Sequence, residues 1–254
     1  MILELSELIR QSVEQSLEDR VAISFSGGLD STTLATIAKN HSDVELFSCG
    51  SENCQDLQYA EKVASVLSLP LTKIIVDGEH ALSAYGELYS FLPLDFLKLE
   101  ILVPVYCVAK AAAEKKHKVL LFGAGAEELF VGYDRYYAYH DKGEDLDSIL
   151  KKEFDTLKQR EITWIKKICF KFNIEARFPF YDNKLADLVF SIPLEDRMED
   201  KELKKGTLRE AAKVLKVPDI AIKRKKKAMQ YGSGIHKMLL KHSEKINKEY
   251  PAQN

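Results

Sequence analysis

Two adjacent glycines and an aspartate stand where an apolar run, residues 21–25, gives way to a helix-like stretch. The segment consists of Ser26, Gly27, Gly28, Leu29, Asp30 and Ser31. Adjacent glycines permit positive φ and close backbone approach, which leaves N–H groups free to bind an anion where a helix begins. The segment has no lysine, and the chain lacks the G-x-x-x-x-G-K-[ST] motif. These residues predict a phosphate-binding loop and disfavour transfer of a γ-phosphate.

Asp30 adds a second requirement to this loop. Its carboxylate would repel a bound phosphate unless a cation lay between the two groups. A Mg²⁺ ion that bridges carboxylate and phosphate oxygens meets this requirement. We therefore expect a magnesium nucleotide here. The alternative is that the two glycines form a purely structural turn between a strand and a helix.

Apolar runs alternate with helix-like stretches through the first half of the chain. Strands are expected at 21–25, 44–48, 71–76 and 119–122, and helices at 5–17, 31–39, 57–67 and 103–116. Asp30 or Ser31 is expected to cap the second helix. Strands that are joined by helices run parallel and are buried on both faces. The alternation predicts an α/β fold with a doubly wound parallel sheet.

The composition changes after Gly123. A tyrosine cluster precedes a charged, helix-like stretch that runs from about 145 to 172; its members are Tyr133, Tyr136, Tyr137 and Tyr139. We expect a nucleotide-binding α/β core at 1–140 and a mainly helical C-terminal portion at 141–254 that completes the site. No flexible linker separates the two, so this boundary marks a change of architecture and a single domain remains an alternative.

Overall composition limits the partners and the compartment. A net charge of −2, from 37 basic and 39 acidic residues, gives no global attraction to nucleic acid or to an anionic membrane. The first residues are acidic where a secretory signal is positive, and no uncharged apolar run is long enough to span a membrane. We expect a cytoplasmic protein whose four cysteines are reduced. They are Cys49, Cys54, Cys107 and Cys169.

Four segments, in this order along the chain, resemble one family. The glycine loop is similar to the PP-loop of N-type ATP pyrophosphatases, which have the adenine nucleotide α-hydrolase-like (HUP-type) fold. Residues 121–133, 175–182 and 224–234 are similar to segments of the asparagine synthetase C-terminal domain. The resemblance covers most of the chain and implies one site at the carboxyl ends of the strands. Arg177 and Asp182, in the third segment, are expected to form a buried ion pair.

The resemblance implies an adenylation reaction with ATP and Mg²⁺ as cofactors. A substrate carboxylate would attack the α-phosphorus of ATP and release pyrophosphate, and ammonia or an amine would then displace AMP. Asp30 and Glu127 would hold Mg²⁺, and Lys226 would contact the phosphates as the main catalytic residue. Cys49 would form a wall for adenine, with Ser24 or Phe25 beside it. The residues expected around ATP are Ser24, Phe25, Ser26, Gly27, Gly28, Asp30, Ser31, Cys49, Gly123, Gly125 and Lys226.

Three departures from the family pattern leave the acceptor open. Glutamine-using asparagine synthetases have a catalytic cysteine after the initiator methionine, where this chain has Ile2, so we expect no glutaminase activity. The nitrogen would come from ammonia, from an amine, or from a separate subunit. The family's Gly-Glu-Gly has Ala124 at its centre here, which weakens the case for aspartate and ammonia as substrates. Glu127 stands where the family usually has aspartate.

Two other functions stay open at this stage. One is a PP-loop enzyme that adenylates a base oxygen of RNA, in which the four cysteines could carry sulfur or an iron–sulfur cluster. The basic residues that would contact RNA phosphates are Lys204, Lys205, Arg209, Lys213 and residues 223–227. The other is a nonenzymatic nucleotide-binding regulator, which Ala124 suggests. The oligomeric state is open, with a homo-oligomer among the alternatives.

Overall fold

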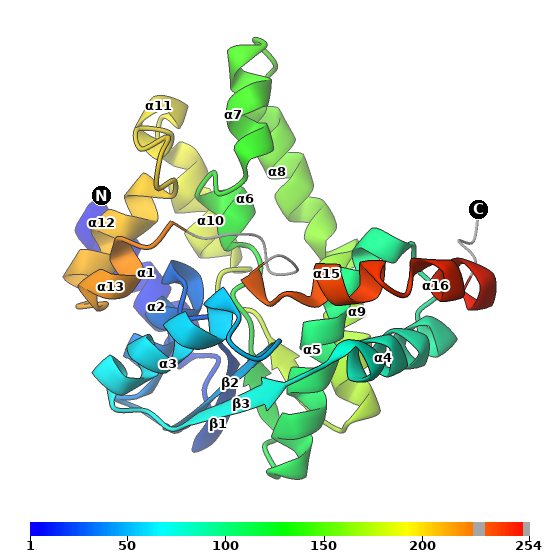
Figure 1. The fold of residues 1–254 in the computed structure, drawn as a ribbon. Helices are drawn as coiled ribbons and strands as arrows, with labels where there is room; N and C mark the ends of the chain where they lie inside the picture. The colour runs from blue at the N-terminus through cyan, green and yellow to red at the C-terminus, as the bar shows by residue number, and fades with distance from the viewer. Residues whose placement is uncertain (226–231, 251–254) are drawn as a thin grey trace.

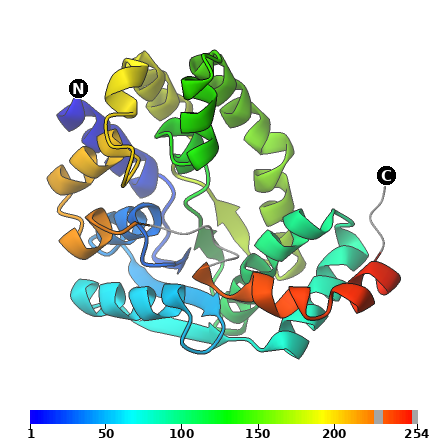
Figure 2. The ribbon, with the colours of Figure 1, turned by 45° about the horizontal axis from the view of Figure 1, so that its top comes forward.

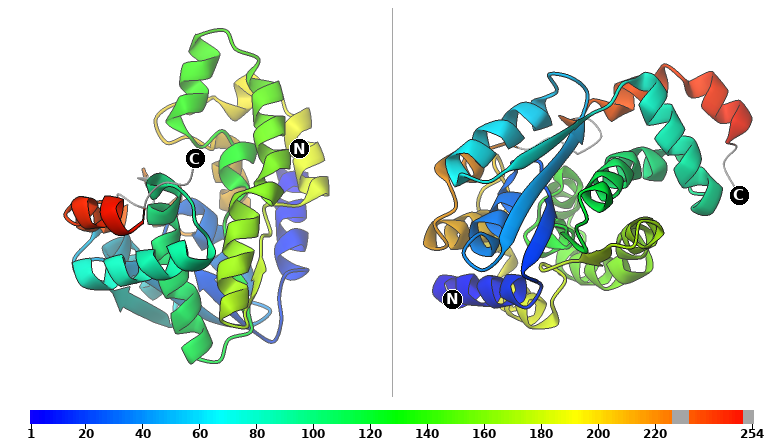
Figure 3. Two further views of the ribbon diagram at one scale, coloured as in Figure 1. Left: turned by 90° about the vertical axis from the view of Figure 1, so that its right-hand side faces the viewer. Right: turned by 90° about the horizontal axis from the view of Figure 1, so that it is seen from below.

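The computed structural model describes residues 1–225 and 232–250. At its centre is a parallel sheet of five strands in the order β3-β2-β1-β4-β5, enclosed by helices (Figure 3). The strands are β1 (Arg20–Ser24), β2 (Asp43–Gly50), β3 (Leu71–Ile75), β4 (Val119–Leu121) and β5 (Glu175–Arg177). The predicted α/β fold with a doubly wound parallel sheet is confirmed.

Two apolar cores separate the helices into two layers. The core on one face includes side chains of α1 (Ile2–Glu14), α2 (Leu29–Ala38), α3 (Gln55–Leu67), α10 (Asn183–Ser191) and α12 (Gly206–Val214). The core on the other face includes side chains of α4 (Gly78–Phe91), α5 (Phe96–Glu114), α9 (Glu161–Lys171) and α15 (Ile235–Leu240). Figure 2 shows the last helices returning to the sheet, with α12 next to α1 and α15 next to α4.

Further helices extend beyond the carboxyl edge of the sheet. They begin with α6 (Ala126–Leu129), α7 (Asp134–Asp141), α8 (Leu146–Thr156) and the short 3₁₀ helix η1 (Leu157–Gln159). The remaining short helices are α11 (Leu194–Arg197), α13 (Asp219–Ile222) and α16 (Ser243–Glu249), of which α13 contributes to the first core and α16 to the second. Figure 1 shows α7 and α8 rising from this edge. A small third core buries Tyr136 and Tyr137 of the tyrosine cluster there. The mainly helical C-terminal portion also supplies β5, so both sides of the expected boundary at residue 140 contribute to one sheet.

The strand order changes direction between β1 and β4. The chain builds outward from β1 through β2 and β3, and then places β4 on the other side of β1. Ligands of open α/β sheets bind beyond the carboxyl ends of the strands at such a point. The loops that follow β1 and β4 meet there, because a Cβ atom built on Gly123 would lie 3.1 Å from the Cβ atom of Asp30. The topology therefore marks this edge as the place for a site.

Two local expectations are wrong. Gly28 is the N-cap of α2, with extended φ −80° and ψ 169°, so Asp30 and Ser31 lie inside the first turn and do not cap it. Arg177 contacts Glu18 at 2.8 Å and Glu175 at 2.9 Å, whereas the Asp182 carboxylate accepts the Leu185 N–H at 2.8 Å and caps α10. The expected Arg177–Asp182 ion pair does not form, because each group meets a nearer partner.

Within the described ranges, no helix has the length and apolar character needed to cross a membrane.

Glu45 on β2 is the centre of a buried polar group at the opposite edge of the sheet. It accepts hydrogen bonds from His117 at 3.0 Å, from Thr72 at 2.7 Å and from Lys115. Burial alone would raise the pKa of Glu45, but these hydrogen bonds outweigh it and lower the pKa to about 2. The carboxylate therefore stabilises the fold at any pH above its unfolded value of 4.5.

We expect Glu45→Gln to lower the free energy of unfolding at pH 7 by roughly 3 kcal/mol, the equivalent of this pKa shift. The pKa in the folded state is depressed, so the difference between wild type and variant should shrink as the pH falls from 4.5 toward 2. Urea denaturation at pH 7, 5 and 3 measures it. A difference that stays constant over this range would show that the charge of Glu45 contributes nothing.

Candidate active site

The phosphate loop is pressed against α3. Gly27 has φ +67°, and a Cβ atom there would lie 2.9 Å from the backbone of Tyr59 and Ala60, so glycine is needed for both conformation and space. Within the loop, the hydroxyl oxygen of Ser31 accepts the N–H of Ser26, and that of Ser26 accepts the N–H of Gly28, both at 3.4 Å. Hydrogen bonds of this length are weak. A bound anion could therefore replace them at little cost.

A buried lysine lies between the two predicted magnesium ligands. Lys205 Nζ is 2.8 Å from both carboxylate oxygens of Asp30 and 3.0 Å from Glu127 Oε1. Lys205 and Asp30 are 6% and 7% exposed. Burial by itself would lower the pKa of Lys205, but the two carboxylates outweigh it and raise the pKa, so the amine is a charged ammonium. One cation thus joins the loop after β1 to the segment after β4.

The backbone around Lys205 is strained to place this ammonium. Lys204 and Lys205 have φ values of +59° and +57°, in the left-handed region. This conformation costs about 1–2 kcal/mol for each residue that is not glycine. Opposite them, a Cβ atom on Gly132 would lie 1.8 Å from Glu127 Oε2 and 2.5 Å from Lys205 Cε. The cluster therefore depends on glycine at 132 and on a strained turn before α12, which is a common property of functional sites.

The donor atoms of this cluster suit the Mg²⁺ ion that the family implies. Two carboxylates, Asp30 and Glu127, converge on a point where a cationic nitrogen already lies. Mg²⁺ prefers oxygen ligands and is usually held by one or two carboxylates together with substrate phosphates. In the part of the chain that the structure describes, no group of three or more acidic, histidine or cysteine residues could hold a metal ion. The residues present therefore fit a Mg²⁺ ion that arrives with a nucleotide.

A third carboxyl group, Glu128, lies close enough to this cluster to interact with Glu127 and Lys205. It is 4% exposed. Burial and the neighbouring charge of Glu127 raise its pKa to about 7. A carboxyl group that titrates near neutral pH can both give and accept a proton under physiological conditions. Burial also raises the pKa of Tyr133, which ends the same glycine-rich segment, so its hydroxyl stays protonated.

The expected adenine side of the site lies at the end of β2. Cys49 is the penultimate residue of that strand, and its thiol is buried and interacts with the thiol of Cys107 on α5. Burial and this contact raise the pKa of Cys49, so it is not an activated nucleophile. Ser24 ends β1, whereas Phe25 is 3% exposed and belongs to the apolar core. The side chain of Phe25 therefore faces the core.

Lys226 lies outside the described residues. Among the other basic residues that were candidates for RNA contact, Lys205 and Arg209 are each 6% exposed. Arg209 donates to the backbone carbonyl oxygens of Lys204, Ile222 and Arg224. Both side chains therefore bind groups of the protein itself: Lys205 the two carboxylates, and Arg209 these backbone carbonyls.

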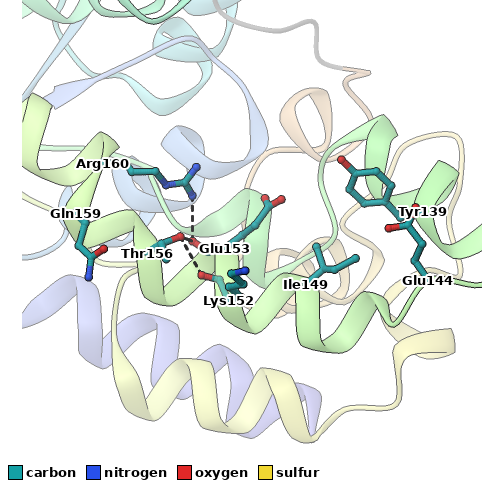
Figure 4. Close-up of a pocket in the computed structure, with 8 residues that line it drawn as sticks. All are labelled: Tyr139, Glu144, Ile149, Lys152, Glu153, Thr156, Gln159 and Arg160. Carbon is teal, nitrogen blue, oxygen red and sulfur yellow. Dashed lines mark hydrogen bonds between the residues drawn. The ribbon is translucent and has the colours of Figure 1, made fainter. Parts of the chain in front are cut away.

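The hollow shown in Figure 4 is a separate feature. Its lining residues come from α7, α8 and the following turn, and include none of the loop residues: Tyr139, Glu144, Ile149, Lys152, Glu153, Thr156, Gln159 and Arg160. In Figure 4 the side chain of Arg160 reaches the backbone of Glu153, a 3.3 Å hydrogen bond. None of these lining residues belongs to the carboxylate cluster, so the hollow is not part of that site.

Three members of this site are absent from the ATP site predicted from the sequence, and Lys205 and Arg224 appear only among the candidates for RNA contact. Glu128 follows Glu127 in the segment 121–133, so this pair of adjacent acidic residues could have indicated it. Arg224, whose contacts are described below, opens the basic segment. Lys205 stands in a basic stretch whose composition is typical of an exposed surface. Its contact partner, Asp30, is 175 residues away in the sequence. No local pattern could have selected it.

Fold and loop together define an α/β protein of the PP-loop class. A family model described as asparagine synthase matches residues 4–167 and 140–253, and this chain belongs to that family. Both of the glycine-rich segments that form the carboxylate cluster fall inside the first matched range.

Curated relatives agree with this membership. The chain is 31% identical over 261 residues to a putative glutamine-hydrolysing asparagine synthetase of Methanocaldococcus jannaschii, covering 89% of this chain and 48% of that protein. It is 24% identical over 250 residues to asparagine synthetase B of Escherichia coli, covering 89% and 44%. The chain thus spans less than half the length of these relatives. A solved structure of NMN synthetase from Francisella tularensis aligns with a TM-score of 0.47 at 14% identity, covering 98% of this chain and 93% of that one.

Glu128→Gln should stabilise the protein at alkaline pH. The folded pKa of about 7 is above the unfolded value of 4.5, so ionisation of Glu128 opposes folding as the pH rises through 7. We expect the variant to exceed wild type by up to roughly 3 kcal/mol at pH 8 and to match it at pH 4.5. Urea denaturation at the two pH values tests this. Equal stability at pH 8 would mean that Glu128 ionises without cost.

Lys205→Met should destabilise the protein by about 3–5 kcal/mol at pH 7, because it leaves buried carboxylates without their cation. Adding Asp30→Asn to this variant should recover part of the loss. Lys204→Met is the matched control, since Lys204 pairs with Asp134, whose side chain is 94% exposed. Urea denaturation of the three variants measures their free energies of unfolding. Equal losses of stability in Lys204→Met and Lys205→Met would contradict a specific role for the buried ammonium.

Proposed function

We propose that this chain is an AMP-forming, ATP-dependent ligase that adenylates a carboxylate and passes the acyl group to ammonia or an amine. The observation that carries the proposal is the convergence of Asp30, Glu127 and the Lys205 ammonium beside the phosphate loop. Charge stabilisation is the main requirement of this chemistry, and a preorganised group of fixed charges next to an anion cradle supplies it. Membership of the asparagine synthase family supports the same class of reaction.

In this proposal the N–H groups of the loop and of the first turn of α2 bind the β- and γ-phosphates. Asp30 and Glu127 would hold Mg²⁺, which neutralises phosphate charge when it is bound. Lys205 is already buried and charged, so its ammonium can follow negative charge onto the departing pyrophosphate without a change of protonation. Lys226 would add a second ammonium, as the resemblance implies.

The second half of the reaction requires a proton to leave the attacking amine. Ala124 cannot accept a proton at the position where the family has a glutamate. Glu128 is a carboxyl group in the same segment with a pKa near neutrality, which suits it to this transfer. We therefore propose Glu128 as the group that accepts this proton.

For the activated carboxylate and the nitrogen source, the proposal names candidates only. Relatives named as asparagine synthetases make aspartate one candidate for the activated carboxylate, and ammonia one candidate for the nucleophile. These relatives are described as glutamine-hydrolysing, so a separate glutaminase subunit is a further candidate for the nitrogen supply.

Isotope exchange between pyrophosphate and ATP tests the proposal. We expect exchange that requires Mg²⁺ and one substrate from a panel of carboxylates, and release of AMP and not ADP when ammonia or an amine is added. Lys226→Ala should reduce exchange by at least about 100-fold, in the range for loss of one charge-stabilising group. Lys223→Ala is the control, because Lys223 pairs with Asp219 at the surface. Formation of ADP would refute the mechanism, and exchange that requires RNA would favour an RNA-modifying enzyme.

A further inference from the structure

A buried ion pair underneath the phosphate loop has no part in the chemistry described above. Arg224 Nη2 lies 2.5 Å from Asp56 Oδ1, and the two side chains are 1% and 4% exposed. The other terminal nitrogen, Nη1, donates to the backbone carbonyl oxygen of Ser26. The guanidinium also stacks on Tyr59, with 4.1 Å between its central carbon and the ring centre. Arg224 thus connects α3 to the first residue of the loop.

The bond to Ser26 determines which way the loop presents its N–H groups. A peptide unit is planar and trans, so the carbonyl of Ser26 and the N–H of Gly27 point in opposite directions. Because Arg224 holds the carbonyl, the N–H of Gly27 must face away from the guanidinium. The positive φ of Gly27 and its close approach to α3 also restrict the Ser26–Gly27 peptide to this orientation.

The Asp56 carboxylate also lies next to Gly232, near the end of the 224–234 segment. A Cβ atom built on Gly232 would lie 2.4 Å from Asp56 Oδ2, and the next residue, Ser233, accepts the N–H of Ser51 at 2.8 Å through its carbonyl oxygen. Asp56 therefore contacts both Arg224 and Gly232. The two contacts fix these residues relative to the loop that holds Ser26.

We propose that Arg224, oriented by Asp56, is a positioning residue of the phosphate loop: it fixes the Ser26–Gly27 peptide so that its N–H faces the pyrophosphate group of the nucleotide. The inference rests on the proposed function, because it assigns pyrophosphate to this loop. Arg224 acts through geometry and not through its charge, since Asp56 neutralises the guanidinium at 2.5 Å.

Arg224→Lys and Asp56→Asn separate geometry from charge. Lysine keeps the positive charge but lacks the rigid fork that reaches Ser26 and Asp56 together. We expect Arg224→Lys to weaken binding of magnesium pyrophosphate by about tenfold or more, as for loss of one charge-assisted hydrogen bond, while binding of AMP stays within about twofold. Asp56→Asn leaves the guanidinium without its orienting charge. Positioning predicts weaker pyrophosphate binding in this variant, whereas a direct charge effect predicts tighter binding.

Arg197→Lys is a matched control. Arg197 is also fully buried, and it also donates to one backbone carbonyl, that of Ile192, and to one carboxylate, that of Asp147, but it lies in α11 away from the loop. Calorimetric titrations of each protein with magnesium pyrophosphate and with AMP give the result, alongside urea denaturation. Normal pyrophosphate binding in Arg224→Lys, tighter binding in Asp56→Asn, or equal losses of both ligands would overturn the inference, as would the same pattern in Arg197→Lys. A wild-type protein that binds no pyrophosphate would refute the proposed function itself.

Discussion

Lys205 reaches the carboxyl edge of the sheet from the start of α12, and its ammonium is shared by Asp30 on α2 and Glu127 on α6. Each of these elements belongs to a different part of the chain, and no apolar contact could hold two carboxylates this close in the interior. The ion cluster therefore links the loop after β1 to the segment after β4, at the ends of two paired strands. The strained backbone at Lys204 and Lys205 and the missing side chain at Gly132 follow from it.

Two buried cations approach the phosphate loop with different tasks. Lys205 bridges two carboxylates, so its ammonium offsets negative charge that would otherwise repel a phosphate. Arg224 is neutralised by Asp56 and binds the backbone carbonyl of Ser26, so it fixes the orientation of the Ser26–Gly27 peptide. This division matches the chemistry of the two side chains, because lysine is a compact point charge and arginine a rigid planar fork. A site that binds an anion by N–H groups needs both.

Sequence patterns were sufficient for the parts of the fold that are set locally. Strands β1, β2, β3 and β4 are short apolar runs, and the glycine loop lies between a strand and a helix, so both could be predicted. The three-residue β5 begins and ends with the charged residues Glu175 and Arg177 and is defined by its pairing with β4. The start of α2 depended on the backbone of Gly28, and the contact of Lys205 depended on tertiary structure. The residues that bind the loop from a distance therefore had to come from the structure.

The separation of Asp30 and Lys205 along the chain also affects how the protein is made. Asp30 lies on a helix whose ten residues are all buried, yet its counterion follows 175 residues later. At about 5–20 residues per second, a ribosome needs roughly 10–35 s to synthesise that interval. During this time Asp30 lacks the Lys205 ammonium that it contacts in the finished structure. The ion cluster can form only after Lys205, at the start of α12, has left the ribosome, which makes completion of this edge a late step of folding.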